Sequence, residues 1–224
     1  MKENDLKVII LGVIACIIFL IIISLVGVAY INNSPGAYTY IVDIEGLQNY
    51  QPTLITDVII PLPGTSEERP GFTDDDFQYK IFGDWRSMLV MTPYGKMLAF
   101  ESIGRNLTDI HAIFSKTYSE GIRIENFTQD SFQPVLPFIN SDYTQWVYGK
   151  DLNRNYSTII YIPDSIKPFN AENANITFSL DLGASEGMQH SMVGKHYHVI
   201  VREVIPSGVR NWTPVVAQVG ELPH

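Results

Sequence analysis

The sequence predicts an all-β ectodomain, β-sandwich or jelly-roll-like with about ten strands and one short helix, on a single N-terminal transmembrane helix. Three observations predict this fold class. A long apolar run without charged residues lies near the N-terminus. Short apolar stretches separated by Pro, Gly, Asn and Asp follow it. The alternation of strands with helices that builds parallel sheets is missing, which disfavours an α/β enzyme fold.

The apolar run predicts a signal-anchor helix over residues 8–31. At about 1.5 Å per residue its uncharged part would measure roughly 34 Å, enough to cross a hydrocarbon core of about 30 Å. Lys2 and Lys7 precede the run, and no basic residue follows it until Arg69. Because basic residues concentrate on the cytoplasmic side, residues 1–7 are expected inside the cell.

The chain is expected to continue through a linker, residues 32–36, into an extracellular β domain, residues 37–224. Two processing signals compete with an uncleaved anchor. Small residues in Gly27-Val28-Ala29 suit a signal peptidase, and Val13-Ile14-Ala15-Cys16 fits a bacterial lipobox. The uncleaved anchor is favoured because secretory cores usually run about 7–15 residues, and because apolar sequence continues past Cys16.

Composition restricts the compartment and the partners. Cys16 is the only cysteine, so the ectodomain must fold without disulfides, which suits a prokaryotic, archaeal-like envelope. The charged residues before the anchor cancel, so the ectodomain carries the whole net charge of −9. Such an acidic surface disfavours nucleic acid and anionic lipid as partners. Membrane lipid around the anchor and envelope proteins or polysaccharide are the partners that this sequence suits.

Asn-x-Ser/Thr triplets, the acceptors for N-glycosylation, exceed the chance expectation. Chance would give roughly two among the asparagines of this chain, and six are present. All six lie on the predicted outer side of the membrane. Asn32 is doubtful because Pro35 follows its triplet and the membrane is close. The predicted glycosylation sites are Asn106, Asn126, Asn155, Asn175 and Asn211.

Period-2 patterns and turn residues place the strands. In Ile176–Leu182 the apolar side chains face one way and the polar ones the other, and the acceptor Asn175 falls on the polar face. Pro93-Tyr94-Gly95 predicts a hairpin loop. The predicted strands are Tyr38–Ile44, Leu54–Leu62, Phe77–Phe82, Ser87–Thr92, Lys96–Glu101, Gly121–Phe127, Ser157–Ile162, Ile176–Leu182, His196–Val204 and Pro214–Val219.

One helix is predicted, from Asn106 to Ser119, with Gly121 as its stop signal. Its apolar residues recur at spacings of three and four, as on one face of a helix. They are Leu107, Ile110, Phe114 and Tyr118.

Gly183-Ala184-Ser185-Glu186-Gly187 matches the nucleophile elbow of serine hydrolases. The match is weak, because an elbow needs a following helix and a triad acid, and no Asp follows Gly187. A Gly-rich loop between two strands is the preferred interpretation. The sequence therefore assigns no catalytic residue, and an enzymatic role is not favoured.

Methionine and histidine residues near the C-terminus suggest a metal site. In an extended chain Met188, His190 and Met192 share one face, and His196 and His198 share one face of the next strand. Thioethers with imidazoles suit Cu(I), and imidazoles alone suit Zn²⁺. The two faces converge only if a hairpin forms between them. A polar strand face with packed methionines explains the same residues, and no resident cofactor is predicted.

Two further candidates have simpler explanations. Asp74-Asp75-Asp76 lacks the ligand spacing of an EF-hand, so a solvated acidic turn is favoured over a Ca²⁺ loop. Trp85, Trp146 and Trp212 could line a carbohydrate platform, although tryptophans of β domains more often fill the core.

Together these patterns favour a membrane-anchored, N-glycosylated cell-surface protein with a structural or interaction role in the cell envelope. One alternative is an extracytoplasmic Cu or Zn binding protein that uses segment 188–198. The other is a pilin-like filament subunit, which is weakened because no basic-plus-Gly cleavage site precedes the apolar run.

Overall fold

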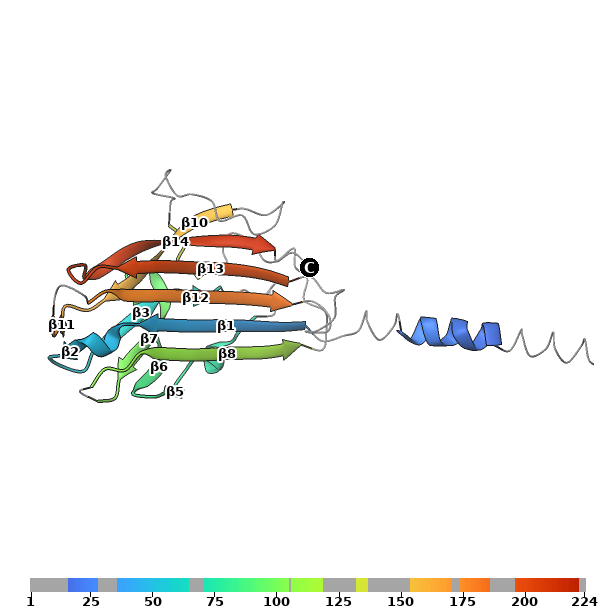
Figure 1. Ribbon diagram of the computed structural model, residues 1–224, viewed down its shortest axis with the longest axis horizontal. Coiled ribbons are helices and arrows are strands. Elements are labelled where there is room, and N and C mark those ends of the chain that lie inside the picture. Colours follow the sequence, from blue (N-terminus) through green and yellow to red (C-terminus); the bar gives the residue numbers. More distant parts are fainter. Residues whose placement is uncertain are drawn as a thin grey trace, which may run out of the picture.

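The computed structural model describes residues 16–27, 36–64, 71–104, 106–118, 132–136, 154–170, 174–185 and 196–221. Residues 16–27 form an α-helix whose large apolar side chains are exposed (Figure 1). Within these ranges, no helix is both long enough and apolar enough to cross a membrane. The other described residues are predominantly in strands, which confirms a mostly β fold.

Fourteen strands and two short 3₁₀ helices make up the β domain in these ranges. The strands are β1 (Gly36–Glu45), β2 (Tyr50–Pro52), β3 (Asp57–Ile60), β4 (Leu62–Pro63), β5 (Ile81–Phe82), β6 (Trp85–Thr92), β7 (Gly95–Ser102), β8 (Ile110–Tyr118), β9 (Phe132–Gln133), β10 (Arg154–Ile162), β11 (Ile166–Pro168), β12 (Ile176–Ser185), β13 (His196–Ile205) and β14 (Asn211–Glu221). The 3₁₀ helices are η1 (Leu47–Asn49) and η2 (Asp74–Asp76).

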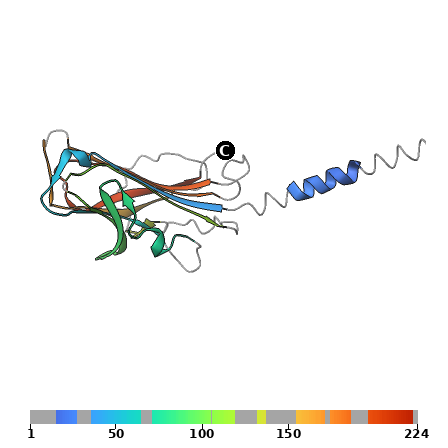
Figure 2. The same cartoon turned by 90° about the horizontal axis from the view of Figure 1, so that it is seen from below.

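Ten strands form one antiparallel sheet in the order β5-β6-β7-β3-β10-β14-β13-β12-β1-β8. Figure 1 shows β14, β13, β12, β1 and β8 side by side, and Figure 2 shows this layer edge-on with shorter strands on one face. The sheet therefore folds back on itself as two layers. Its terminal strands approach each other, because the ring of Phe82 in β5 lies 5.3 Å from that of Phe114 in β8. The architecture is a single ten-stranded sheet that is close to closing as a barrel.

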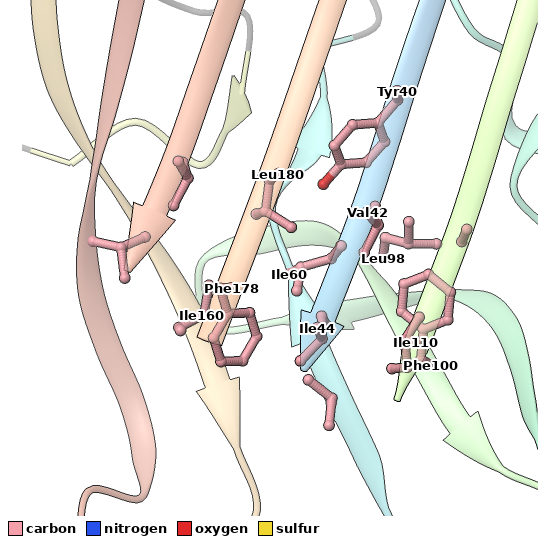
Figure 3. Packing of buried hydrophobic residues seen from close by; sticks show 14 of the residues in the cluster. Tyr40, Val42, Ile44, Ile60, Leu98, Phe100, Ile110, Ile160, Phe178 and Leu180 are labelled. Carbon is pink, nitrogen blue, oxygen red and sulfur yellow. The ribbon is translucent and has the colours of Figure 1, made fainter. Parts of the chain in front are cut away.

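The core lies between the two layers and comes from alternate residues of each strand. Tyr40, Val42 and Ile44 of β1 face the interior beside Phe178 and Leu180 of β12 (Figure 3). Burial of one such side chain contributes about 1.5–3 kcal/mol. Tyr40 is fully buried, and its hydroxyl donates a 2.9 Å hydrogen bond to the carbonyl of Pro61. Its burial, and secondarily Tyr156, raise its pKa well above the usual value, so this phenol stays protonated.

Most predicted strands are confirmed, including the predicted hairpin. In β6 and β7, Thr92 pairs with Gly95, so the loop consists of Pro93 and Tyr94. The alternation predicted for β12 is also confirmed, because its burial alternates along the strand up to Leu182.

Two strand predictions are wrong in extent. The run predicted from Leu54 enters the sheet only at Asp57, and the strand predicted from Phe77 is reduced to Ile81–Phe82. Tyr79 has a φ of 58°, a left-handed conformation that interrupts an extended strand. The predicted strand 121–127 lies outside the described residues, and the short strands β2, β9 and β11 were not predicted.

The predicted helix 106–119 is wrong, because residues 110–118 form strand β8. β8 pairs with β1 along its whole length, so the backbone groups that face β1 form interstrand rather than helical hydrogen bonds. Ile110, Ala112 and Phe114 are buried at a period of two. Packing against β1 therefore outweighs the helical spacing of the larger apolar residues.

Candidate functional site

Several connections between strands lie together at one end of the β domain. The chain enters β1 at Gly36, and β1 ends at Glu45, roughly 33 Å away at the rise of an extended strand. We call the end at Glu45 the distal end. The β1–β3 and β7–β8 connections lie here together with the two-stranded sheet of β2 and β11, as Figure 1 shows.

A groove of about 1270 Å³ opens at the distal end. Its volume exceeds the roughly 300–1,000 Å³ that is usual for small-molecule pockets. Among the described residues that line it, Lys167 is the only charged one, although the whole chain has a net charge of −9. The lining residues are Gln48, Tyr50, Gln51, Pro52, Thr53, Leu54, Ile55, Ile103, Gly104, Asn106, Leu107, Lys167 and Phe169.

Large apolar side chains around this groove point into solvent. Leu54 is 75% exposed, Ile55 72%, Phe169 69% and Ile103 55%. Single exposed apolar residues are common on protein surfaces, whereas a cluster of them around a groove makes that groove a candidate interaction site. We call these four residues the apolar rim.

Hydrogen bonds fix the backbone on both sides of Leu54 and Ile55. The Thr53 N–H donates to the Ser165 carbonyl at 2.8 Å, and the hydroxyls of Thr56 and Ser165 lie 2.6 Å apart. Thr56 also exchanges bonds with Ser102, its N–H donating to the Ser102 hydroxyl at 3.1 Å. The two apolar residues are therefore exposed on a constrained loop.

Phe169 and the floor of the groove are held in a similar way. The Phe169 N–H donates to the Asn49 carbonyl at 3.0 Å. Tyr50 is 1% exposed, and its hydroxyl donates a hydrogen bond to the Ala174 carbonyl. The guanidinium of Arg210 lies 5.1 Å from the centre of the Tyr50 ring, within range of a cation–π contact.

The β7–β8 connection closes the remaining side of the groove. Leu107 is buried, and the indole N–H of the buried Trp85 donates to the Thr108 carbonyl at 2.8 Å. Asn106 is exposed and lines the groove. A predicted glycosylation acceptor thus lies within the candidate site.

The predicted metal residues are only partly described. Met188, His190 and Met192 lie outside the described residues, so metal binding stays a prediction. Strand β13, which contains His196 and His198, pairs with β12 and β14. His198 in β13 has Nδ1 2.7 Å from Asp181 Oδ1. Where the structure describes the chain, it brings together no cluster of three or more His, Cys, Asp or Glu side chains suited to a metal.

His196 lies at the start of β13, opposite Ser185. Gly183, Ala184 and Ser185 belong to β12, so they form a strand rather than the predicted loop. Ser185 is paired and 8% exposed, unlike the serine of a nucleophile elbow, which projects from a sharp turn. A Cβ at Gly183 would lie 3.4 Å from Cε1 of His198, so glycine here leaves space for the imidazole ring.

The acidic triplet forms η2, with Thr73 and Asp76 capping the helix reciprocally. Lys96 pairs with Asp74 and Lys116 with Asp76, each at 2.7 Å. Partial burial alone would raise the pKa of Asp76, but hydrogen bonds from Lys116 and Thr73 and the Lys116 charge bring it below its usual value. Lysines thus neutralise two of the three carboxylates.

The two described tryptophans, Trp85 and Trp212, do not form the predicted carbohydrate platform. Trp85 is fully buried and Trp146 lies outside the described residues. Trp212 packs against Tyr94 and Tyr161, with ring centres 5.0 and 4.9 Å away. This aromatic cluster lies on β10, β14 and the β6–β7 loop.

Four predicted glycosylation acceptors are described. Asn106, Asn175 and Asn211 are exposed, whereas Asn155 in β10 is half-buried. Asn32 and Asn126 lie outside the described residues. Exposure makes the first three accessible to a transferase, and glycosylation itself stays a prediction.

Comparison of the chain with protein-family models, curated proteins and solved structures finds no match. The class of protein is therefore defined by its fold and its site alone: an all-β domain with an apolar-rimmed groove at one end. The sequence does not predict the groove, because Leu54 and Ile55 are interpreted there as the start of the strand Leu54–Leu62. The flanking residues Thr53 and Thr56 give no periodic signal that separates an exposed apolar pair from a buried one.

Proposed function

We propose that this protein is a membrane-anchored, N-glycosylated cell-surface protein whose distal groove binds a protein partner in the cell envelope. The apolar rim carries this proposal. Side chains that become fully desolvated on binding carry most of the energy of an interface, and rigid positioning lowers the entropy lost when they dock. Leu54 and Ile55 meet both conditions, because they are exposed on a hydrogen-bonded loop.

The chemistry of the groove favours a protein segment as its occupant. Its volume is more than a typical small ligand fills. The side-chain amides of Gln48 and Gln51 offer donors and acceptors that peptide groups can use, while the rim offers apolar contacts. The acidic net charge disfavours nucleic acid and anionic lipid. The partner is therefore expected to present apolar side chains on a neutral or basic surface.

The membrane location is supported by sequence and by exposure. The proposed anchor, residues 8–31, contains the helix 16–27. The large apolar side chains of this helix are exposed, and their transfer from water into lipid is favourable. Lys2 and Lys7 precede it, no basic residue follows it until Arg69, and exposed glycosylation acceptors lie further along the chain. Each feature suits an extracellular β domain.

Topology is tested by adding protease to intact cells. We expect digestion of the β domain and retention of an N-terminal peptide in the membrane. A mature protein that begins at Tyr30, or a β domain resistant outside but digested after lysis, would reject the anchored topology.

Partner binding is tested by photo-crosslinking in intact cells, with a photoreactive amino acid at Phe169. A matched control carries it at Val204, which is 54% exposed on strand β13. We expect one crosslinked envelope protein from position 169 only, and its loss when Leu54→Ser and Ile55→Ser are added. The same adducts from both positions, or adducts unaffected by the rim substitutions, would reject the groove as the binding site.

A further inference from the structure

We propose that an N-linked oligosaccharide on Asn106 covers the distal groove and regulates its access. The proposal rests on the proposed function for its extracellular location and for the role of the groove. It concerns the occupant of the groove in the unbound protein.

Asn106 is placed to carry such a sugar. It is exposed, it lines the groove, and Leu107 and Thr108 complete its acceptor triplet. Leu107 is buried and the Thr108 carbonyl is held by Trp85, so the backbone on the C-terminal side of Asn106 is fixed. A fixed backbone beside Asn106 keeps the attachment point of the sugar at the groove.

A sugar at this position alters the part of the site that matters for binding. Ile103 precedes Asn106 by three residues and belongs to the apolar rim. An N-linked oligosaccharide is bulky and hydrophilic, so it screens nearby apolar surface from water and from partners. Chains with the sugar at Asn106 therefore keep the groove covered, and chains without it expose the groove for docking.

Two other exposed acceptors provide matched controls from the same end of the domain. Asn175 directly precedes β12, and its carbonyl adjoins Gly46 at the end of β1. Asn211 pairs with Ile162 at the end of β10 that leads into β11. Neither asparagine is a lining residue of the groove. Sugars there add the same bulk near the distal end without an attachment point inside the groove.

The experiment uses full-length protein from its native cells. Glycopeptide mass spectrometry measures occupancy at each acceptor, and carbene labelling then measures solvent access at Ile103 and Phe169. The variants are Asn106→Gln and Thr108→Ala, which both remove the Asn106 sugar, and the controls Asn175→Gln and Asn211→Gln. We expect the labelling of both rim residues to rise severalfold in the first pair and to stay at the wild-type level in the controls.

Two results would overturn the inference: a bare Asn106 in protein that carries sugar at Asn175 or Asn211, or labelling of the rim that is unchanged when the Asn106 sugar is lost. Neither result depends on a partner, so the binding function is judged separately by crosslinking from position 169. If sugars cover the groove but no partner crosslinks, the binding function fails and the covering sugar stands.

Discussion

Leu47 and Leu54 lie seven positions apart in the same connection between β1 and β3, yet the first is fully buried and the second is 75% exposed. Leu47 packs into the hydrophobic core, and Leu54 projects from the same connection beside the groove. The same residue type thus supplies stability at one position and a binding surface at the other. The comparison extends to the whole molecule: core substitutions should unfold the protein, whereas rim substitutions should change only its binding.

The largest loss of stability is expected in the core. Phe114 is 1% exposed and packs against the rings of Tyr40, Phe77 and Phe82. Phe114→Ala should lower the free energy of unfolding by about 3–5 kcal/mol, because it removes apolar burial and leaves a cavity. Urea denaturation of the detergent-solubilised protein measures this change. The exposed control Val204→Ala should stay within about 0.5 kcal/mol of the wild type, and equal losses in both would contradict the assignment of the core.

A second large effect is expected where β1 turns into the distal end. Gly46 has a φ of 90°, and a Cβ there would lie 2.2 Å from the carbonyl oxygen of Asn175. Gly46→Ala should therefore cost more than about 2 kcal/mol through backbone strain and steric overlap. Gly208→Ala is the control, because a Cβ there meets nothing within 4 Å. Similar denaturation midpoints for the two variants would show that this turn can relax.

Strands β12 and β8 show how much of the fold could be predicted from the sequence alone. Strand β12 was predictable because Ile176, Phe178, Leu180 and Leu182 alternate with polar residues, and one buried face requires that pattern. Strand β8 was not predictable in this way. Ile113 occupies an exposed position and the small Ala112 a buried one, so the period of two was hidden.

The candidate site was less accessible to sequence reasoning than the fold. Glycosylation triplets are visible in any sequence, so Asn106 could be singled out before its place was known. The groove depends on contacts between segments far apart in the chain, such as Thr53 with Ser165 and Phe169 with Asn49. No local pattern encodes those contacts, and an apolar pair such as Leu54 and Ile55 is ordinarily interpreted as buried.

A smaller effect, of opposite sign, is expected from a carboxylate pair on the shorter layer. Asp57 in β3 pairs in register with Glu101 in β7, and no described residue donates a hydrogen bond to its buried Oδ1. Partial burial, and then the charge of Glu101, raise the pKa of Asp57. The folded state therefore binds this proton more tightly than the unfolded state does. Stability falls as pH rises from the usual pKa of Asp, about 4, through the raised value.

Asp57→Asn removes this unfavourable charge and keeps the shape of the side chain. At pH 7 the variant should be more stable than the wild type, by less than about 1 kcal/mol because solvent screens a half-exposed group. Below about pH 4 the difference should disappear, since the wild-type carboxyl is then protonated in both states. Denaturation midpoints measured at both values test this, and an advantage of the same size at both would exclude the charge as its cause.

The smallest effect on stability is expected from substitutions in the apolar rim. These substitutions distinguish leucine that stabilises the fold from leucine that is available for binding. Leu54→Ser with Ile55→Ser removes two large side chains that are already 75% and 72% exposed, so little buried apolar area is lost. The free energy of unfolding should change by no more than about 0.5 kcal/mol. Leu47→Ser, seven residues earlier, removes a fully buried side chain and leaves an unpaired hydroxyl, so it should cost several kcal/mol. Urea denaturation of both variants, beside crosslinking from position 169, completes the comparison. The rim variant should keep its stability and lose its adduct; a rim variant that unfolds early would mean that Leu54 and Ile55 support the fold and that the division between anchoring and binding residues is wrong.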